Sequence, residues 1–148
     1  MAGLFEAIVE IDRPVGEVFA FLADGENDPK FSPRVIRIEK TTEGPPGVGT
    51  VYTSTVKDAG LTTRRSFRIS AFDAPTRIRW NEISKNLVTA EEGGYDLEPT
   101  GTGGTRVRIF NILRGHGIGR LLTGFALRAA RKDSAAFGLR IKAAVEAS

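Results

Sequence analysis

The segment IGRLLTGFALRAARKDSAAFGLRIKAAVEA, residues 118–147, is the one stretch of this sequence that is long and regular enough to form a major helix. At about 100° per residue, its apolar side chains gather on one side of the helix and most of its basic side chains on the other. The apolar side comprises Ile118, Leu121, Leu122, Phe125, Ala126, Ala129, Ala136, Phe137, Leu139, Ala143 and Ala144. This arrangement predicts an amphipathic helix whose broad apolar face covers the rest of the fold.

Nearly all of the sequence before residue 118 has the apolar–polar alternation of β-strands. The first strand is expected at residues 5–11, and two short helices follow it at residues 15–23 and 26–32. Asp12 is expected to cap the first of these helices, with Pro14 in its first turn. Further strands are expected at residues 35–38, 51–57, 62–72, 77–84, 87–97 and 105–113.

The short connections between successive strands favour an antiparallel meander, which can leave one face in water while the long helix covers the other. We therefore predict a single domain over residues 1–148 with an α+β fold of the helix-grip type. Its curved antiparallel β-sheet wraps around the long C-terminal helix, and two short helices follow the first strand. The Gly93-Gly94 pair predicts a bulge or sharp bend in the strand at residues 87–97. Small ligands bind in the space that such a sheet and helix enclose.

Composition excludes several kinds of site. The sequence has no cysteine, which excludes disulfides and thiolate metal sites, and its one histidine, His116, excludes a histidine-rich metal site. No metal or cofactor is therefore expected. No apolar run reaches the roughly 18 residues that a membrane-spanning helix needs. Because the N-terminus resembles a strand and carries Glu6 and Glu10, it is not expected to be a signal peptide. The expected location is the cytoplasm, without stable membrane insertion.

Positive charge is concentrated in the C-terminal helix. The formal net charge is +3, and from Arg114 onward seven Arg and Lys residues face only Asp133 and Glu146. A basic helix face can bind nucleic acid or an anionic membrane. No interleaved aromatic residues and no nucleic-acid motif accompany these charges, so solvated surface residues are favoured and no nucleic-acid partner is expected.

Alternation with apolar neighbours indicates which polar side chains point toward the helix. Ile78 and Trp80 are expected to be buried, which places Glu82 on the same inner face. Tyr52 is a further candidate for this face, but its strand alternates too weakly to decide its direction. The full inner polar set is Arg65, Glu82, Tyr95 and Asn111 from the strands and Asp133 from the helix.

Two of these assignments have structural alternatives. Arg65 and Glu82 either take part in ligand chemistry or form a structural ion pair, or they lie at the mouth of a pocket. Asp133 either lines the pocket or pairs with a basic neighbour such as Arg140, because a lone buried carboxylate is costly to ionise.

Three segments resemble the START-like superfamily of SRPBCC proteins, which includes bacterial polyketide cyclase/dehydrase-like proteins. They are IDRPVGEVFAFLAD at residues 11–24, GPPGVGT at residues 44–50 and the final helix at residues 119–147. The resemblance spans essentially the whole chain, and these segments shape the scaffold more than the chemistry. Many relatives carry tryptophan in the second short helix, where this chain has Phe31.

The resemblance implies a helix-grip fold and a mostly apolar pocket with a few orienting polar groups. It also implies aldol-type cyclisation or dehydration of a polyketone, in which an inward Arg stabilises an enolate and a carboxylate moves a proton. Arg65 and Glu82 are the candidates for these two catalytic roles. Relatives also include lipid and hormone binders and co-chaperone domains, so the fold alone does not settle the function.

The leading interpretation is binding of a hydrophobic, aromatic or polycyclic small molecule between the sheet and the C-terminal helix. This interpretation leaves open whether the protein also has polyketide cyclase/dehydrase-like activity and whether it forms a homodimer. The alternative functions are a pure lipid carrier and a protein-interaction module like the co-chaperone relatives. The candidate ligand-binding residues are Tyr52, Trp80, Tyr95, Asn111, Phe125, Ala129 and Asp133.

Overall fold

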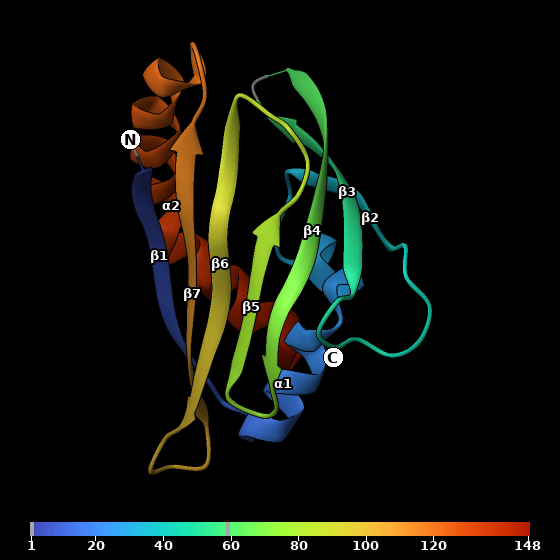
Figure 1. Cartoon of the computed structure of the whole chain (residues 1–148). Helices are drawn as coiled ribbons and strands as arrows, with labels where there is room; N and C mark the ends of the chain where they lie inside the picture. Colours follow the sequence, from blue (N-terminus) through green and yellow to red (C-terminus); the bar gives the residue numbers. More distant parts are fainter. Residues whose placement is uncertain (1, 59) are drawn as a thin grey trace.

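Strands and helices follow one another along the chain in the order that the sequence pattern predicts. The structure is a computed structural model that describes residues 2–58 and 60–148. Its elements in chain order are β1 (Ala2–Ile11), α1 (Val15–Ala23), the 3-10 helix η1 (Gly25–Lys30), β2 (Val35–Lys40), β3 (Val51–Asp58), β4 (Leu61–Asp73), β5 (Arg77–Glu82), β6 (Val88–Pro99), β7 (Thr105–Gly115) and α2 (Gly119–Glu146) (Figure 1).

All seven strands of the described chain join one antiparallel sheet in the order β1-β7-β6-β5-β4-β3-β2. Strands β2 to β7 follow one another as a meander, and β1 closes the order by pairing with β7 from Ala2–Arg114 to Ile11–Thr105. The helices lie on the same side of this curved sheet, behind it in Figure 1. The α+β helix-grip prediction is confirmed.

Helix α2 packs mainly against β1, at the edge of the sheet, with smaller contacts to β7 and β6. Small residues make this approach close: a Cβ on Gly138 would lie 3.3 Å from Val9 Cβ, and a Cβ on Gly3 would overlap the Leu127 side chain. The buried positions of the helix are Gly119, Thr123, Leu127, Gly138, Ile141 and Val145.

The predicted apolar face of α2 is wrong along most of the helix. Of its eleven residues nine are exposed, Ile118, Leu121, Leu122 and Phe125 among them, and only Phe137 and Ala144 are half-buried. The prediction assumed that the most apolar side meets the sheet. Close packing on an edge strand instead selects the side with glycine and threonine, because large side chains would hold the two backbones apart.

Two local predictions also need correction. Asp12 does not cap α1, whose N-cap is Pro14 without a side-chain hydrogen bond; the Asp12 N–H instead donates to Glu146 at 2.9 Å, at the end of α2. The register shift in β6 lies between Ala90 and Glu92, before the predicted Gly93-Gly94 bend. The glycine at position 93 serves close packing, as described below.

The core lies between the inner face of the sheet and the helices. Phe31, at the end of η1, is buried and contacts Phe137 of α2 edge-to-face at 6.0 Å between ring centroids. Phe137 in turn contacts Phe5 of β1, also at 6.0 Å. This aromatic chain joins η1, α2 and β1, so the residue that replaces the relatives' tryptophan is part of the core. Within the described residues, no helix is long and apolar enough to cross a membrane.

Candidate functional site

Trp80, Tyr95 and Asn111 form a cluster on the inner face of β5, β6 and β7. The Trp80 and Tyr95 rings meet edge-to-face with centroids 5.2 Å apart, and Trp80 Nε1 donates a hydrogen bond to Asn111 Oδ1 at 3.0 Å. This bond crosses β6 at Gly93, where a Cβ would overlap both Asn111 Oδ1 and the indole nitrogen. Glycine at position 93 is therefore what allows the cluster to form.

Two polar groups of this cluster have no hydrogen-bond partner among the described residues. The indole N–H can only donate, so Asn111 turns its amide oxygen toward Trp80 and keeps its amide nitrogen free. Neither that nitrogen nor the Tyr95 hydroxyl makes a hydrogen bond within the described part of the chain. Since the described chain leaves no fully buried polar side-chain atom unsatisfied, both groups retain access to solvent, although Tyr95 is only 4% exposed.

Asp28 of η1 adds a titratable group that the sequence analysis missed. Burial raises the pKa of Asp28 to about 7, and the nearby Asp24 carboxylate contributes to the rise. Burial also raises the pKa of Tyr95 well above its usual range, and the Asp28 carboxylate contributes to the rise. No hydrogen bond to the Asp28 carboxylate is formed within residues 2–58 and 60–148, and the residue as a whole is half-buried. No periodic pattern marks a residue in a single 3-10 turn, so the sequence carries no signal for it.

Tyr52 of β3 also lies on the inner face of the sheet, where it contacts the turn between α1 and η1. Its ring packs on the backbone of Gly25, where a Cβ would lie 2.9 Å from the ring. Its hydroxyl donates to the Ala23 carbonyl at 3.4 Å. Burial raises the pKa of Tyr52, and Asp24 and Asp28 contribute to the rise. Tyr52 is buried on the inner face, which its strand's weak alternation left undecided, and a ligand contact through its ring stays a prediction.

Arg65 and Glu82 form an ion pair, with Nη1 and Oε1 3.0 Å apart. The Glu82 side chain is fully buried, and its oxygens also accept from Ala90 N at 2.9 Å, Ser84 Oγ at 2.6 Å and Asn86 Nδ2 at 2.7 Å. This carboxylate is saturated with donors, and protonation would break several of these bonds at once. The geometry matches the structural ion pair that the sequence left open.

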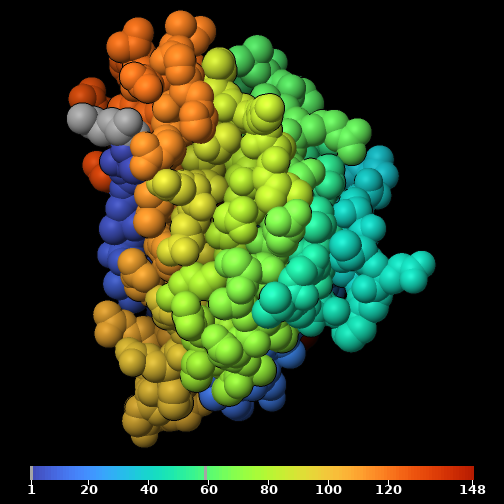
Figure 2. Space-filling view, viewed as in Figure 1, coloured from blue at the N-terminus to red at the C-terminus, as the bar shows by residue number. Residues whose placement is uncertain are grey.

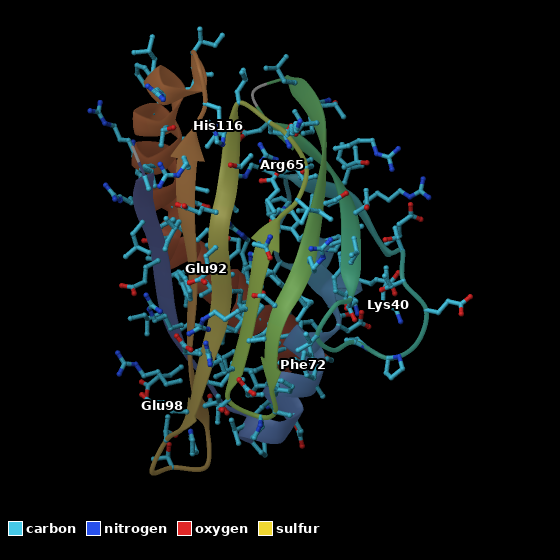
Figure 3. The ribbon with its side chains drawn as sticks, in the orientation of Figure 1. Lys40, Arg65, Phe72, Glu92, Glu98 and His116 are labelled. Atoms are coloured by element: carbon cyan, nitrogen blue, oxygen red, sulfur yellow. The ribbon has the colours of Figure 1, made fainter. Side chains whose placement is uncertain are left out.

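The Arg65 guanidinium also connects this ion pair to β6. It donates to the Val88 carbonyl at 2.9 Å, and Figure 3 shows Arg65 beside the connection between β5 and β6. Its side chain remains 24% exposed. The catalytic roles of Arg65 and Glu82 stay predictions.

The three candidates from α2 do not join the inner cluster. Phe125 is 71% exposed and Ala129 is also exposed, because the helix turns this flank away from the sheet. Asp133 pairs with Arg140 at 2.7 Å, and this hydrogen bond lowers the pKa of the Asp133 carboxyl. Arg140 also donates to the Phe31 carbonyl at 3.1 Å. Of the two alternatives for Asp133, the structure has the pair with Arg140.

No group of three or more His, Asp or Glu side chains in the described residues could hold a metal ion. His116 Nε2 lies 2.8 Å from Thr89 Oγ1 in an exposed position, near the start of α2 (Figure 3).

Two shallow hollows of about 180 and 290 Å³ lie elsewhere on the chain. The first lies on the outer side of β2, β3 and β4, and the second between α1, η1 and the loop before β3. Neither is lined by Trp80, Tyr95 or Asn111. The candidate site is therefore assigned from the Tyr95 hydroxyl and the Asn111 amide nitrogen, which have no hydrogen-bond partner among the described residues, and not from a hollow.

Similar folds are found among solved structures. The protein TTHA0849 from Thermus thermophilus superposes with a TM-score of 0.80 at 19% identity, over 98% of each chain. The Zhui aromatase/cyclase from Streptomyces sp. R1128 superposes at 0.74 and 17% identity, over 98% of this chain and 92% of that one. A START superfamily protein from Mycobacterium smegmatis superposes at 0.72 and 14% identity, over 97% of each. At these identities the likeness shows a shared START-like fold.

Sequence comparison carries the assignment further. No functionally curated protein is significantly similar to the chain. The sequence model of the family described as polyketide cyclase/dehydrase and lipid transport matches residues 3–146, nearly the whole of the 148-residue chain. A domain of this kind is a hydrophobic ligand-binding fold, in agreement with the apolar core that faces its helices. The chain therefore belongs to the polyketide cyclase/dehydrase and lipid transport family.

Proposed function

We propose that the protein binds a hydrophobic small molecule with an aromatic or polycyclic skeleton against the cluster of Trp80, Tyr95 and Asn111. The observation that carries the proposal is the pair of partnerless polar groups, the Tyr95 hydroxyl and the Asn111 amide nitrogen, beside the Trp80 ring. An apolar surface with a small number of placed polar groups is the usual composition of a ligand site. Aromatic rings favour a flat aromatic ligand through edge-to-face or offset contacts.

The polar groups also suggest which functional groups the ligand carries. The Asn111 amide nitrogen can only donate, so it suits a carbonyl oxygen. The Tyr95 hydroxyl can donate to a carbonyl or accept from a phenol. A molecule with an aromatic skeleton and carbonyl or phenol oxygens satisfies both groups, whereas a plain hydrocarbon chain satisfies neither.

Proton transfer at a carbonyl compound is the second candidate function, and the raised pKa of Asp28 favours it. A carboxyl group with a pKa of about 7 is partly ionised near neutral pH, where a general base works best. The Asp28 carboxylate would remove a proton from the carbon next to a ketone and become the carboxylic acid. The Tyr95 hydroxyl would donate a hydrogen bond to the enolate oxygen that forms.

A thermal-shift screen against polycyclic aromatics, flavonoids, sterols and fatty acids tests the binding proposal. A ligand that binds only the folded state stabilises it by about 2.7 kcal/mol at a hundredfold excess over Kd. We expect a shift for aromatic compounds with carbonyl groups. Tyr95→Phe should weaken binding by about tenfold, the loss of one hydrogen bond, and Asn111→Leu by at least as much, because it also removes the acceptor of Trp80 Nε1.

Tyr52→Phe is the matched control, because its hydroxyl already has a partner in the Ala23 carbonyl. It should leave affinity unchanged. The proposal fails if no compound class shifts the transition, or if Tyr95→Phe and Asn111→Leu bind every active compound like the parent protein. Preferential binding of sterols or fatty acids without dependence on these two residues would indicate the pure lipid carrier instead.

A further inference from the structure

The first half of α2 turns an apolar ridge away from the sheet. Ile118, Leu121 and Phe125 are 69%, 76% and 71% exposed, and their spacing of three and four residues places them on one helix face. Leu87, half exposed, lies beside the start of this ridge, because its carbonyl accepts a hydrogen bond from His116 N at 2.8 Å. In Figure 2 this part of the chain, in orange, protrudes at the edge of the molecule.

Basic side chains accompany the ridge along the helix. Between Glu98 and Asp133 the sequence has no acidic residue. Arg120, Arg128 and Lys132 are exposed and form no ion pair with any described residue. Arg128 and Lys132 follow Phe125 by three and seven residues, so they continue the same face of the helix. A partner for this surface must therefore be apolar at its centre and negatively charged around it.

The combination of apolar and basic side chains favours some partners for this ridge over others. A two-fold contact between copies of the chain would bring the same basic side chains together, and like-charge repulsion opposes that arrangement. The ridge is also convex, whereas a helix that docks into a protein partner needs a matching groove. Phe, Leu and Ile side chains bordered by Arg and Lys on a protruding helix are typical of helices that lie in the interface of an anionic bilayer.

We propose that this ridge docks the protein on the surface of an anionic phospholipid bilayer. The Ile118, Leu121 and Phe125 side chains enter the headgroup region, and the Arg128 and Lys132 side chains contact lipid phosphates. The contact is peripheral, since α2 stays in the plane of the interface. It is independent of the proposed ligand site, because none of its residues belongs to the cluster of Trp80, Tyr95 and Asn111.

Vesicle flotation tests the inference with phosphatidylcholine vesicles and with vesicles of phosphatidylcholine mixed with phosphatidylglycerol. The parent protein should float with the anionic vesicles alone, and added salt should weaken the binding. The double variant Leu121→Ser/Phe125→Ser should bind at least about tenfold more weakly. Arg128→Gln should bind about fivefold more weakly, as expected for one basic residue at an anionic surface.

Ile36→Ser is the matched control. Ile36 is 56% exposed on β2, at the opposite edge of the sheet from β1 and α2, so its loss should leave vesicle binding unchanged. All of these side chains are exposed, and the thermal transition of each variant should match that of the parent protein.

Four results would overturn the inference. The parent protein could ignore anionic vesicles at low salt, or the double variant could bind them undiminished. The parent protein could bind an acidic polypeptide such as polyglutamate through these residues while ignoring vesicles, which would indicate a protein partner. It could also self-associate in sedimentation experiments in a way that the double variant abolishes, which would assign the ridge to a second copy of the chain.

Discussion

Replacing Glu82 by glutamine tests whether its buried carboxylate braces the upper part of the sheet. The fully buried side chain accepts hydrogen bonds from Arg65, from the Ala90 backbone, and from Ser84 and Asn86 of the connecting loop. In Glu82→Gln one acceptor oxygen becomes an amide nitrogen, so at least one of these donors faces another donor. An unsatisfied buried donor costs about 1–3 kcal/mol.

The loss of the ion pair adds to this cost. Breaking a buried pair typically destabilises a protein by about 3–5 kcal/mol, but Arg65 is 24% exposed and water can take over part of its solvation. We therefore expect Glu82→Gln to lower the free energy of unfolding by about 3 kcal/mol. In a protein of this size each 1 kcal/mol corresponds to about 2–4 °C in Tm, so Tm should fall by about 6–12 °C.

Thermal and urea unfolding, followed by circular dichroism, measure the change. The matched control is Glu98→Gln, which removes an exposed carboxylate paired with Arg106 at 3.5 Å on the outer face. An exposed pair contributes at most about 1 kcal/mol, so this variant should stay within a few degrees of the parent. Equal Tm values for Glu82→Gln and Glu98→Gln would refute the reasoning that the buried carboxylate is a structural brace.

Two further predictions concern the inner face. Burial raises the pKa of Asp28 from 3.8 to about 7 in the folded state. Between these pH values the folded protein therefore binds more protons than the unfolded chain, and its stability should fall as the pH rises from about 4 to 7. Asp28→Asn should remove this pH dependence in urea unfolding, and a pH profile identical to that of the parent protein would contradict the assignment. Gly93→Ala should force apart Trp80 and Asn111 and destabilise the protein by about 1–3 kcal/mol. It should also shift the fluorescence emission of Trp80, the one tryptophan of the chain. Gly47→Ala, at a position with open space around it, is the control, and unchanged emission in Gly93→Ala would show that the cluster does not depend on glycine at position 93.

Sequence periodicity predicted most of the backbone. Strand alternation located all seven strands to within a few residues, and the long apolar–basic pattern located α2 at Gly119–Glu146. The same alternation correctly placed Trp80, Tyr95 and Glu82 on the inner face, whereas it did not decide the position of Tyr52, which is also buried there. It succeeded because a side chain in a strand can only point to one face or the other, and burial of one face decides between them.

Helix orientation could not be predicted in this way. A helix offers a continuous range of faces, and the sequence suggested the most apolar one, with Leu121 and Phe125. The structure instead buries the face with Thr123 and Leu127, because contact with the edge strand β1 rewards close backbone approach over side-chain size. Leu121 and Phe125 are consequently exposed on the surface.

The sequence by itself determined the element order, the antiparallel α+β architecture and the family, since these depend on local periodicity and on segments such as residues 11–24. Only the tertiary structure decided which polar groups have partners. It saturated the Glu82 carboxylate with four donors, paired Asp133 with Arg140, and left the Tyr95 hydroxyl and Asn111 amide nitrogen without a partner among the described residues. The physical reason is that hydrogen bonds require contact within about 3 Å between groups far apart in the chain, and a pattern of residue types contains no such distances.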